Sequence, residues 1–447
     1  MSTSQRPVTI AGWPWIGNVF TYRRRKSEFL SHLRDDGRAL TAFKLGGHKI
    51  ILLKRPEDIL HVEQRNAKNY VKATMLRDLV GDGILMSEGE KWRRQRRLIQ
   101  PHFHPGPVAA LEALMLKRIS TFLTDLEQRG STPIDLGIAL KRLVFGIVLE
   151  ALFGETREED FDELLEPMIT VNEFLTSRFN ELLPLPLGFP IPRYRKFQNA
   201  KSSIDRVIYR YIEIKKSDLA DGRGGGDLLT KMIQAEDPVT GLRMDDLQIR
   251  DEAVSILLAG FETTGNLLAW AFVLLGSHPQ KLSDLTGAMD EDAVGAILDE
   301  TLRLYPSVWA WTKRALDDDD LNGVSIKKGD ILFLSPYLVH RDPKLWPRPE
   351  EFDPARWTSE LRESLKDERK GAYIPFGLGP RTCVGRHFAI LEAKLILTEF
   401  LKNFDFSLVN PDALRPDFKI TLGLRDPLWV RVQKIKSDSN RASGGES

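Results

Sequence analysis

The chain of 447 residues contains a single cysteine, Cys383. Because there is no second cysteine, the chain forms no internal disulfide bond, and the thiol is either a passive packed residue or a reactive or ligating one. The lack of disulfides is typical of proteins from a reducing compartment. The residues around Cys383 decide between the two roles of the thiol.

The segment that contains the thiol reads Phe-Gly-Leu-Gly-Pro-Arg-Thr-Cys-Val-Gly over residues 376–385. Its glycines are Gly377, Gly379 and Gly385. They remove side chains that would keep a large flat cofactor away from the backbone, and two of them also permit the positive φ of a tight turn. Arg381 places a cation two residues before the sulfur. A helical pattern after the cysteine puts Cys383 at a helix N-terminus, where free N–H groups stabilise a thiolate.

This segment resembles the cysteine-ligand loop of the cytochrome P450 family, F-x-x-G-x-R-x-C-x-G. The fixed positions are all present, at Phe376, Gly379, Arg381, Cys383 and Gly385. Since glycine makes up only about 7% of an average chain, a chance match is remote. The resemblance implies that the Cys383 thiolate binds the iron of haem b, iron protoporphyrin IX. It also implies that Phe376, Gly377, Arg381 and Gly385 contact this cofactor.

A proline-free stretch over 245–277 is, as an α-helix, about 50 Å long and crosses a domain. Its centre reads Leu-Ala-Gly-Phe-Glu-Thr-Thr-Gly, and glycines and threonines weaken a helix core, so we expect a widened groove there. This centre is similar to the family's A-G-x-(D/E)-T-T, which faces the iron.

The resemblance implies a role for each residue of this motif. Ala259 lies at the haem, Gly260 opens the helix for dioxygen, Thr263 donates a hydrogen bond to iron-bound oxygen, and Glu262 helps to relay protons for O–O cleavage. Taken alone, the helix favours a solvated Glu262 and a Thr263 hydroxyl bonded back to the Ala259 carbonyl. Beside Cys383, the family role is the better interpretation.

Glu300 and Arg303 lie three residues apart near the end of a predicted helix. Residues at this spacing share a helix face, and an exposed pair of this kind contributes only roughly a few tenths of a kcal/mol. The pair matches the family's E-x-x-R motif, which buries it against an arginine of a later loop, and Arg356 stands where that arginine is expected. The resemblance implies a structural network that locks the cysteine loop.

The two carboxylates of a haem need cationic or N–H partners. Trp92 and Arg96 lie one helical turn apart and match the family's W-x-x-x-R, and Arg381 is a third candidate. The family usually has another arginine after the turn that follows the E-x-x-R helix. The sequence departs from the family at this point, because Lys313 aligns with that arginine, and either Lys313 or the neighbouring Arg314 holds a propionate.

Arg93, Arg94 and Arg97 form a basic run on the same predicted helix. Two interpretations stay open: a solvated face, or part of a docking surface for an acidic ferredoxin or flavodoxin.

The net charge of +1 gives no reason to expect nucleic acid as a partner. The N-terminus has no signal peptide, and no uncharged apolar run approaches the ~18 residues of a membrane span. Many eukaryotic members of the family carry a membrane anchor before a proline-rich hinge, whereas here only Ala-Gly-Trp-Pro-Trp-Ile-Gly-Asn, residues 11–18, represents this region. We expect a bacterial-type, cytoplasmic monomer with no membrane anchor.

Helical periodicity predicts helices over 107–128, 136–153, 158–178, 194–219, 227–235 and 245–277. Two strands are expected around Gly46 and Gly47 and another at 331–334, and the glycine-rich segment 221–226 is a surface loop. The expected fold class is therefore mainly α with a smaller β portion. The resemblance implies the cytochrome P450 fold, with haem between the long central helix and the helix after the cysteine loop.

The motifs lie between residues 92 and 383, so one site draws on nearly the whole chain. This favours a single haem-binding catalytic domain over 1–434, with β-rich parts at about 40–60, 310–340 and 405–433. The tail over 435–447 has a composition typical of disorder.

The resemblance places an apolar substrate above the haem. The candidate contacts are Met75, Leu79, Val80, Leu85, Phe174, Leu182, Leu257, Phe261, Val308, Trp309, Thr421 and Leu422. Any one residue of this kind is more often part of a core than a ligand contact.

These motifs together predict a haem-thiolate monooxygenase that inserts one oxygen atom from O2 into an apolar substrate, with hydroxylation as the expected outcome. Its electrons come from NAD(P)H through a separate ferredoxin or flavodoxin and its reductase. Three alternatives remain: oxidative coupling or cyclisation, a peroxygenase on the same haem site, and a haem sensor without catalysis.

Overall fold

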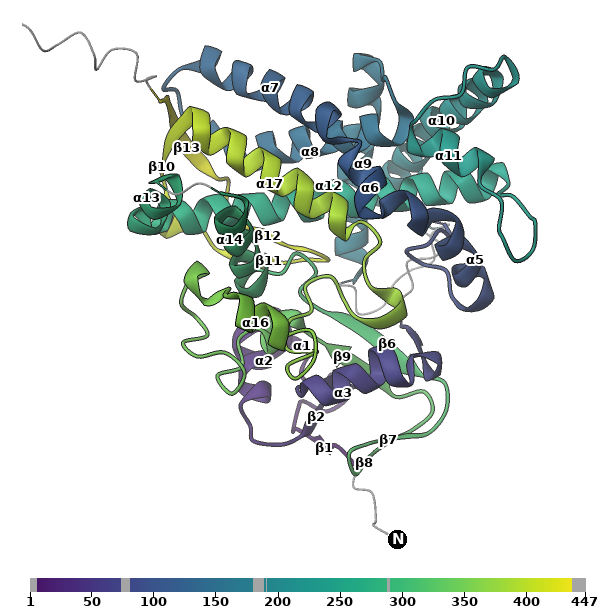
Figure 1. Ribbon diagram of the computed structural model, residues 1–447. Coiled ribbons are helices and arrows are strands. Elements are labelled where there is room, and N and C mark those ends of the chain that lie inside the picture. Colours follow the sequence, from purple (N-terminus) through teal and green to yellow (C-terminus); the bar gives the residue numbers. More distant parts are fainter. Residues whose placement is uncertain (1–5, 74–80, 180–188, 190, 288–289, 436–447) are drawn as a thin grey trace, which may run out of the picture.

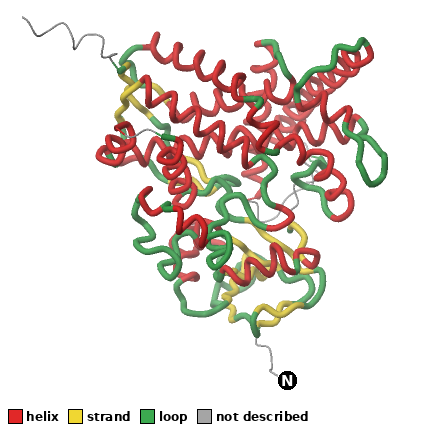
Figure 2. The backbone as a smooth tube through the Cα atoms, viewed as in Figure 1, coloured by secondary structure: helices red, strands yellow, loops and turns green. Residues whose placement is uncertain are grey.

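A computed structural model describes residues 6–73, 81–179, 189, 191–287 and 290–435. Helices fill the upper part of the molecule, and the largest sheet lies in the lower part, near the N-terminus (Figures 1 and 2). The prediction of a mainly α fold with a smaller β portion is confirmed.

The long helix α12, Asp246–Ser277, forms the centre of the helical part. It begins at Asp245, whose side chain accepts a hydrogen bond from the Gln248 N–H at 2.7 Å. Its length and composition would suffice to span a membrane, but 72% of its most apolar window is buried inside the protein. A helix that is apolar on all sides is one that other elements surround.

The other long helices pack around α12. They are α7 (Glu112–Arg129), α8 (Leu136–Phe153), α9 (Glu158–Phe179), α10 (Pro192–Ala220), α14 (Glu291–Leu304) and α17 (Arg386–Asn403). Contacts link α12 to α8, α10, α14 and α17, and Figure 1 shows α17 lying along α12. The predicted helix over 107–128 is divided into α6 (Pro105–Ala109) and α7, because the chain turns at Ala110 and Leu111.

The remaining helices are short. They are α1 (Val19–Arg24), α2 (Lys26–Arg34), α3 (Pro56–Leu60), α5 (Gly89–Ile99), α11 (Leu228–Gln234), α13 (Pro279–Gly287), α15 (Pro336–Val339) and α16 (Ser359–Ser364).

The largest sheet has the order β1-β2-β3-β9-β6-β4. Its strands are β1 (Val8–Thr9), β2 (Leu40–Leu45), β3 (His48–Leu53), β9 (Ile331–Leu334), β6 (Trp311–Ala315) and β4 (Tyr70–Lys72). The predicted strands around Gly46 and Gly47 form the β2–β3 hairpin, with Phe43 opposite Ile50, and the strand predicted at 331–334 is β9.

Smaller sheets lie elsewhere in the chain. One has the order β10 (Phe404–Leu408), β13 (Trp429–Lys434) and β5 (Ile134–Asp135). Two further hairpins in the described residues form sheets of their own: β7 (Asp319–Leu321) with β8 (Val324–Ile326), and β11 (Pro416–Phe418) with β12 (Leu422–Leu424).

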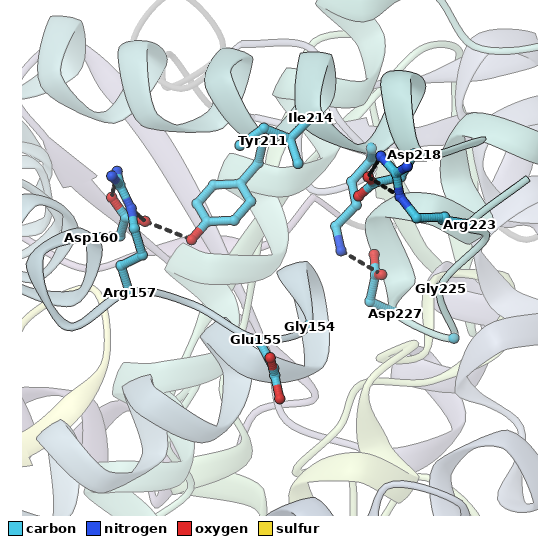
Figure 3. Close-up of a pocket in the computed structure, with 12 residues that line it drawn as sticks. Gly154, Glu155, Arg157, Asp160, Tyr211, Ile214, Asp218, Arg223, Gly225 and Asp227 are labelled. Carbon is cyan, nitrogen blue, oxygen red and sulfur yellow. Dashed lines mark hydrogen bonds and ion pairs between the residues drawn. The ribbon is translucent and has the colours of Figure 1, made fainter. Parts of the chain in front are cut away.

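A surface pocket of about 520 Å³ opens where the end of α8 meets α10 and the loop that leads into α11 (Figure 3). Several of its polar groups are engaged with one another: the Tyr211 hydroxyl donates to Asp160 at 2.6 Å, and Lys215 donates to Asp227 at 2.9 Å. None of the residues predicted for the cysteine site lines this pocket.

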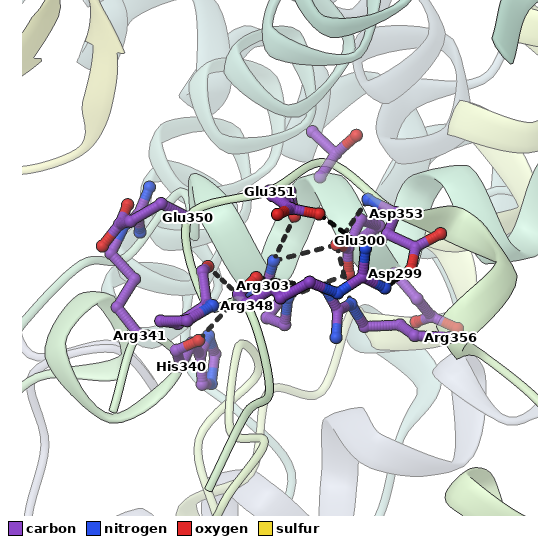
Figure 4. Close-up of polar contacts among 12 residues, drawn as sticks. Asp299, Glu300, Arg303, His340, Arg341, Arg348, Glu350, Glu351, Asp353 and Arg356 are labelled. Carbon is purple, nitrogen blue, oxygen red and sulfur yellow. Dashed lines mark hydrogen bonds and ion pairs between the residues drawn. The ribbon is translucent and has the colours of Figure 1, made fainter. Parts of the chain in front are cut away.

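Glu300 is the centre of a buried polar network (Figure 4). Arg303 binds both of its carboxylate oxygens, at 2.8 and 2.9 Å, and the Arg356 Nε donates to Oε1 at 2.9 Å. The Asp353 N–H and the Trp357 indole complete the set, each at 2.9 Å. The carboxylate thus has four different donor groups, so the cost of burying its charge is offset by a complete set of hydrogen bonds.

The network continues toward the cysteine loop. The Arg303 Nη1 donates to the His340 carbonyl at 2.9 Å, and the His340 Nε2 lies 2.8 Å from the Ile374 N–H. Burial lowers the pKa of His340 to about 3, so the ring is neutral and can accept this bond. The Ile374 carbonyl in turn accepts from the Gly377 N–H at 3.0 Å, inside the cysteine loop.

A second buried contact ties the segment at 81–84 to α12. Asp251 accepts a hydrogen bond from the Asp82 N–H at 2.8 Å, and Glu252 accepts one from the Ile84 N–H at 2.7 Å. A side chain at Gly81 or Gly83 would collide with Asp251, so the approach of the two backbones requires glycine at both positions.

We predict that Glu300→Ala lowers the free energy of unfolding by about 3–5 kcal/mol, because it leaves buried guanidinium groups without their counter-charge. Urea unfolding measures the loss. As a control, Glu363→Ala removes an exposed ion pair with Lys366 and should cost less than about 1 kcal/mol. Equal losses in the two variants would contradict this account of Glu300.

A pH dependence follows from Glu252, because burial raises its pKa from 4.5 to about 8. In the unfolded chain this carboxyl ionises near pH 4.5, whereas in the folded protein it stays protonated up to about pH 8. The contribution of Glu252 to the free energy of unfolding is therefore full below pH 4.5 and is lost as the pH rises toward about 8. In Glu252→Gln this part of the pH dependence should vanish when urea unfolding is measured across the range. If the free energies of unfolding of wild type and Glu252→Gln changed in parallel with pH, the assignment would be wrong. Glu291→Gln, at an exposed position, is the control and should keep the pH dependence of the wild type.

Candidate functional site: a cysteine loop beside the central helix

Cys383 lies in a tight loop that ends just before α17. Its N–H donates to the Phe376 carbonyl at 2.8 Å, which closes the loop. Gly377 and Gly379 have φ of +72° and +68°, a region that favours glycine. A Cβ at Gly379 would lie 2.0 Å from the Glu63 carbonyl oxygen. The loop can therefore form only with glycine at that position.

The Cys383 side chain retains accessible surface although protein surrounds it. Burial raises the pKa of the thiol, whereas the Gly385 N–H and the charges of Arg96 and Arg386 act in the opposite direction. Positive groups beside an enclosed sulfur stabilise its thiolate form, which is the form that binds a metal cation.

The middle of α12 differs from the rest of that helix in its exposure. Ala259 is exposed and Gly260 and Thr263 are half-buried, whereas most of α12 is buried. The helix is α-helical throughout, Gly260 included. Val148 of α8 packs against Gly260, where an added Cβ would lie 3.2 Å from the valine side chain.

Thr263 and Glu262 have different surroundings. The Thr263 hydroxyl donates to the Ala259 carbonyl at 2.6 Å, which is the back-bonded arrangement that the helix alone favoured. Glu262 is buried rather than solvated, and its charge acts on Lys141 of α8. The Ser307 hydroxyl donates to the Thr263 carbonyl at 2.7 Å and holds this part of α12 against the turn after α14.

Arg381 projects from the cysteine loop toward α5. Its guanidinium carbon lies 4.0 Å from the centre of the Trp92 ring, and its Nη2 donates to the Ser87 carbonyl at 2.8 Å and pairs with Glu88. Its Nη1 is buried with no hydrogen-bond partner in the described part of the chain. An unpaired guanidinium nitrogen can donate a hydrogen bond to an anionic group.

Lys313 and Arg314 face opposite sides of the sheet, because successive residues of a strand alternate. Lys313 is buried, with its Nζ 3.3 Å from Glu63, whereas Arg314 is exposed. Of the two residues, only Lys313 therefore lies on the inner side of the sheet, with Glu63.

Lys72 was not predicted as a site residue, yet it stands directly opposite Lys313 in the β4–β6 ladder. Like charges opposite each other on neighbouring strands are destabilising. Burial and the neighbouring cations, Arg381 first among them, lower the pKa of Lys72 to about 8. Only the tertiary pairing of β4 with β6 brings these cations together, so the sequence contained no local signal for Lys72.

Arg96 approaches the cysteine loop from α5. Its Nη1 donates to the Thr382 carbonyl at 2.8 Å, next to Cys383, and its Nε donates to Gln100 at 2.7 Å. The predicted pair Trp92 and Arg96 therefore lies beside the loop, with Trp92 against Arg381.

These residues fit a haem. A thiol with accessible surface supplies a soft ligand. Ala259 leaves α12 free of a large side chain, and no heavy atom outside the loop's own Arg381 and Thr382 lies near a Cβ added at Gly377. The cationic cluster of Lys72, Lys313 and Arg381, with an unpaired Nη1, suits a group that carries two carboxylates.

Six of the eight predicted substrate contacts that lie in the described residues belong to the core. Phe174, Leu257, Phe261, Trp309, Thr421 and Leu422 are buried against protein groups. Phe174 stacks on Phe197 with ring centres 4.3 Å apart, and the Trp309 indole donates to the Lys419 carbonyl at 2.7 Å. As placed, these side chains are packed against other protein groups, and their role as substrate contacts stays a prediction.

Two of the predicted contacts do have exposed surface. Val308 is exposed, and Leu85 is half-buried. Met75, Leu79, Val80 and Leu182 lie outside the described residues.

Glu392 of α17 is a second residue that the motifs did not identify. It is buried, with the Thr264 side chain of α12 beside its carboxyl. Burial raises the pKa of this carboxyl well above its usual range. The sequence contained one signal for Glu392: it is a glutamate on the apolar side of the helical pattern that follows the cysteine.

The basic run on α5 is bound to the protein itself. Arg97 forms two hydrogen bonds to Asp237, at 2.7 and 2.9 Å, Arg94 donates to the Arg243 carbonyl at 2.6 Å, and Arg93 pairs with Glu90. Because these donors are engaged, the run lends no particular support to a docking surface.

Comparison with known proteins agrees with the geometry. The family model described as Cytochrome P450 matches residues 7–427. The chain is 30% identical to cyclooctatin synthase of Streptomyces melanosporofaciens, covering 94% of this chain and 96% of that protein. It is also 30% identical to cyclooctat-9-en-7-ol 5-monooxygenase of the same organism, covering 86% of each.

Among solved structures, the chain resembles the crystal structure of the cytochrome P450DA heme domain. The TM-score is 0.83 and the sequence identity 26%, with 96% of this chain and 98% of that chain covered. The match across the chain and the arrangement around Cys383 lead to one conclusion: the chain belongs to the cytochrome P450 family and is a cytochrome P450 monooxygenase.

Proposed function

We propose that this protein hydroxylates an apolar, largely hydrocarbon substrate with one oxygen atom from O2. The observation that carries the proposal is the accessible Cys383 thiol, set in a complete ligand loop beside an incompletely paired cationic cluster. The relative named as a cyclooctat-9-en-7-ol 5-monooxygenase supports oxygenation of a cyclic alkenol or a molecule like it. Electrons would come from NAD(P)H through a separate ferredoxin or flavodoxin.

In this proposal one haem-binding unit spans the chain to about residue 434, as a monomer in the cytoplasm. Cys383 ligates the iron of haem b, and Arg96, Arg381, Lys313 and Lys72 hold its carboxylates. A bound haem supplies the iron at which dioxygen is activated, and the thiolate ligand favours O–O cleavage. The network around Glu300 is structural and holds the cysteine loop in place through His340.

Thr263 takes the role of a hydrogen-bond acceptor in this proposal. Its hydroxyl hydrogen is committed to the Ala259 carbonyl at 2.6 Å, so its remaining lone pairs are free to accept a hydrogen bond from a polar group beside Ala259. Glu262, one residue earlier and buried, is the carboxyl that exchanges protons with this region.

Replacement of the ligand tests the assignment of Cys383. The reduced wild-type protein with carbon monoxide should show the absorption band of a thiolate-ligated haem, and Cys383→Ser should lose that band because a hydroxyl does not replace the thiolate. Val384→Ala, one residue away, should keep it. A Cys383→Ser protein with an unchanged spectrum and unchanged oxidising turnover would end the proposal.

Replacement of Thr263 tests proton delivery, with an apolar cyclic compound that shifts the spin state of the haem as substrate. Thr263→Ala should still consume NAD(P)H but release peroxide, with product per NAD(P)H reduced at least about tenfold, because the hydroxyl that orders proton delivery is gone. Thr263→Ser should restore most of the coupling. Full coupling in Thr263→Ala would remove this residue from the relay, and turnover with peroxide alone would favour the peroxygenase alternative.

A further inference from the structure

The N-terminal part of the described chain presents large aromatic side chains to the outside. Trp15 is 96% exposed, Trp13 is 69% exposed, and Phe20 is 53% exposed. An indole that is almost fully exposed lacks the packing that normally stabilises a tryptophan in a folded protein. Two exposed indoles within three residues are typical of a surface that binds a partner outside the chain.

The backbone holds Trp15 in this position. Trp13 and Gly17 exchange two hydrogen bonds, at 2.8 and 2.9 Å, and the Gly46 N–H of the β2–β3 turn donates to the Ile16 carbonyl at 3.0 Å. Trp15 has a φ of +64°, one of three positive values for non-glycine residues in the described ranges. A bulky residue adopts this conformation only at a cost, and such strain is typical of functional positions.

The same part of the chain carries a local excess of positive charge. Between Arg6 and Arg34 there are six arginines and lysines and one carboxylate, Glu28, although the net charge of the whole chain is only +1. Arg23, Arg24 and Arg25 are exposed. Arg25 lies 3.7 Å from Glu28, and the other two form no ion pair with the described residues.

The aromatic and basic groups occur on adjoining elements. Helix α1 begins directly after the turn, at Val19. Phe20 precedes Arg23 and Arg24 by three and four residues, so the three side chains share one face of α1. Asn18 joins the turn to β2, because its Nδ2 donates to the Ala11 carbonyl at 2.9 Å and its N–H donates to the Lys44 carbonyl at 2.7 Å. Lys44 is itself exposed.

We propose that the surface formed by Trp13, Trp15, Phe20 and Arg23–Arg25 binds peripherally to an anionic lipid surface. Tryptophan is the side chain that most favours the boundary between headgroups and hydrocarbon, and arginines beside it complement anionic headgroups. The surface lies on the turn, α1 and the neighbouring β2–β3 hairpin, near the sheet-containing end of the molecule (Figure 1). It inserts side chains only, so no spanning helix is required.

This binding would serve the proposed function, because an apolar substrate concentrates in membranes, but it does not depend on the reaction. The residues of this surface are separate from the cysteine site. The CO spectrum of the haem protein should therefore be unchanged by their replacement, which distinguishes failure of this inference from failure of the proposed function.

The test is sedimentation of the haem-loaded protein with vesicles of phosphatidylcholine and phosphatidylglycerol, and with vesicles of phosphatidylcholine alone. We expect binding to the anionic vesicles that weakens as salt is added. Arg23→Ser/Arg24→Ser/Arg25→Ser should weaken it roughly 100-fold, and Trp13→Ala/Trp15→Ala roughly tenfold.

Matched controls remove the same groups elsewhere. Arg206→Ser/Arg223→Ser/Arg243→Ser removes three arginines whose side chains are each 64% exposed, and Val239→Ala/Leu242→Ala removes exposed apolar groups. Both controls should bind as the wild type does. Absence of wild-type binding to anionic vesicles, or equal losses in controls and test variants, would overturn the inference, and absence of binding would leave a protein partner as the occupant of this surface.

Discussion

The geometry of this protein depends on a buried carboxylate, Glu300, that binds two guanidinium groups, a peptide N–H and an indole. A charge in the interior is stable only when its hydrogen bonds are complete, so the loop that carries Arg356 and Trp357 must close over α14. From Arg303 the contacts run through His340 and Ile374 to Gly377. The position of the cysteine loop therefore depends on the packing of the segments that carry His340 and Ile374.

The second determinant is an excess of buried positive charge. Lys72 and Lys313 stand opposite each other, and the charge of Arg381 acts on Lys72. Glu63 and Glu88 compensate part of this charge, and one Arg381 nitrogen stays unpaired among the described residues. An anionic ligand beside these cations would offset the cost of their charge. In the proposed function, the thiol and the cationic cluster bind the same cofactor.

The sequence predicted best those motifs whose residues need particular partners. A lone cysteine between glycines and an arginine, or a glutamate three residues before an arginine, has few stable settings. The substrate contacts stay a prediction, because apolar residues such as Leu257 and Phe261, on a helix that is buried on nearly all sides, suit a core as well as a ligand. The exposure of Ala259 between such residues becomes visible only when the neighbouring helices are in place.

The sequence alone determined the family-like cysteine loop, the long helix, the strands flanking Gly46 and Gly47, and the pairing of Glu300 with Arg303, because spacing and local chemistry specify each of them. Tertiary structure decided that Lys313 and not Arg314 faces inward and that Lys72 stands opposite Lys313. These outcomes depend on which strands pair and which side chains fill the space between helices. Such contacts join residues far apart in the chain, and no local pattern records them.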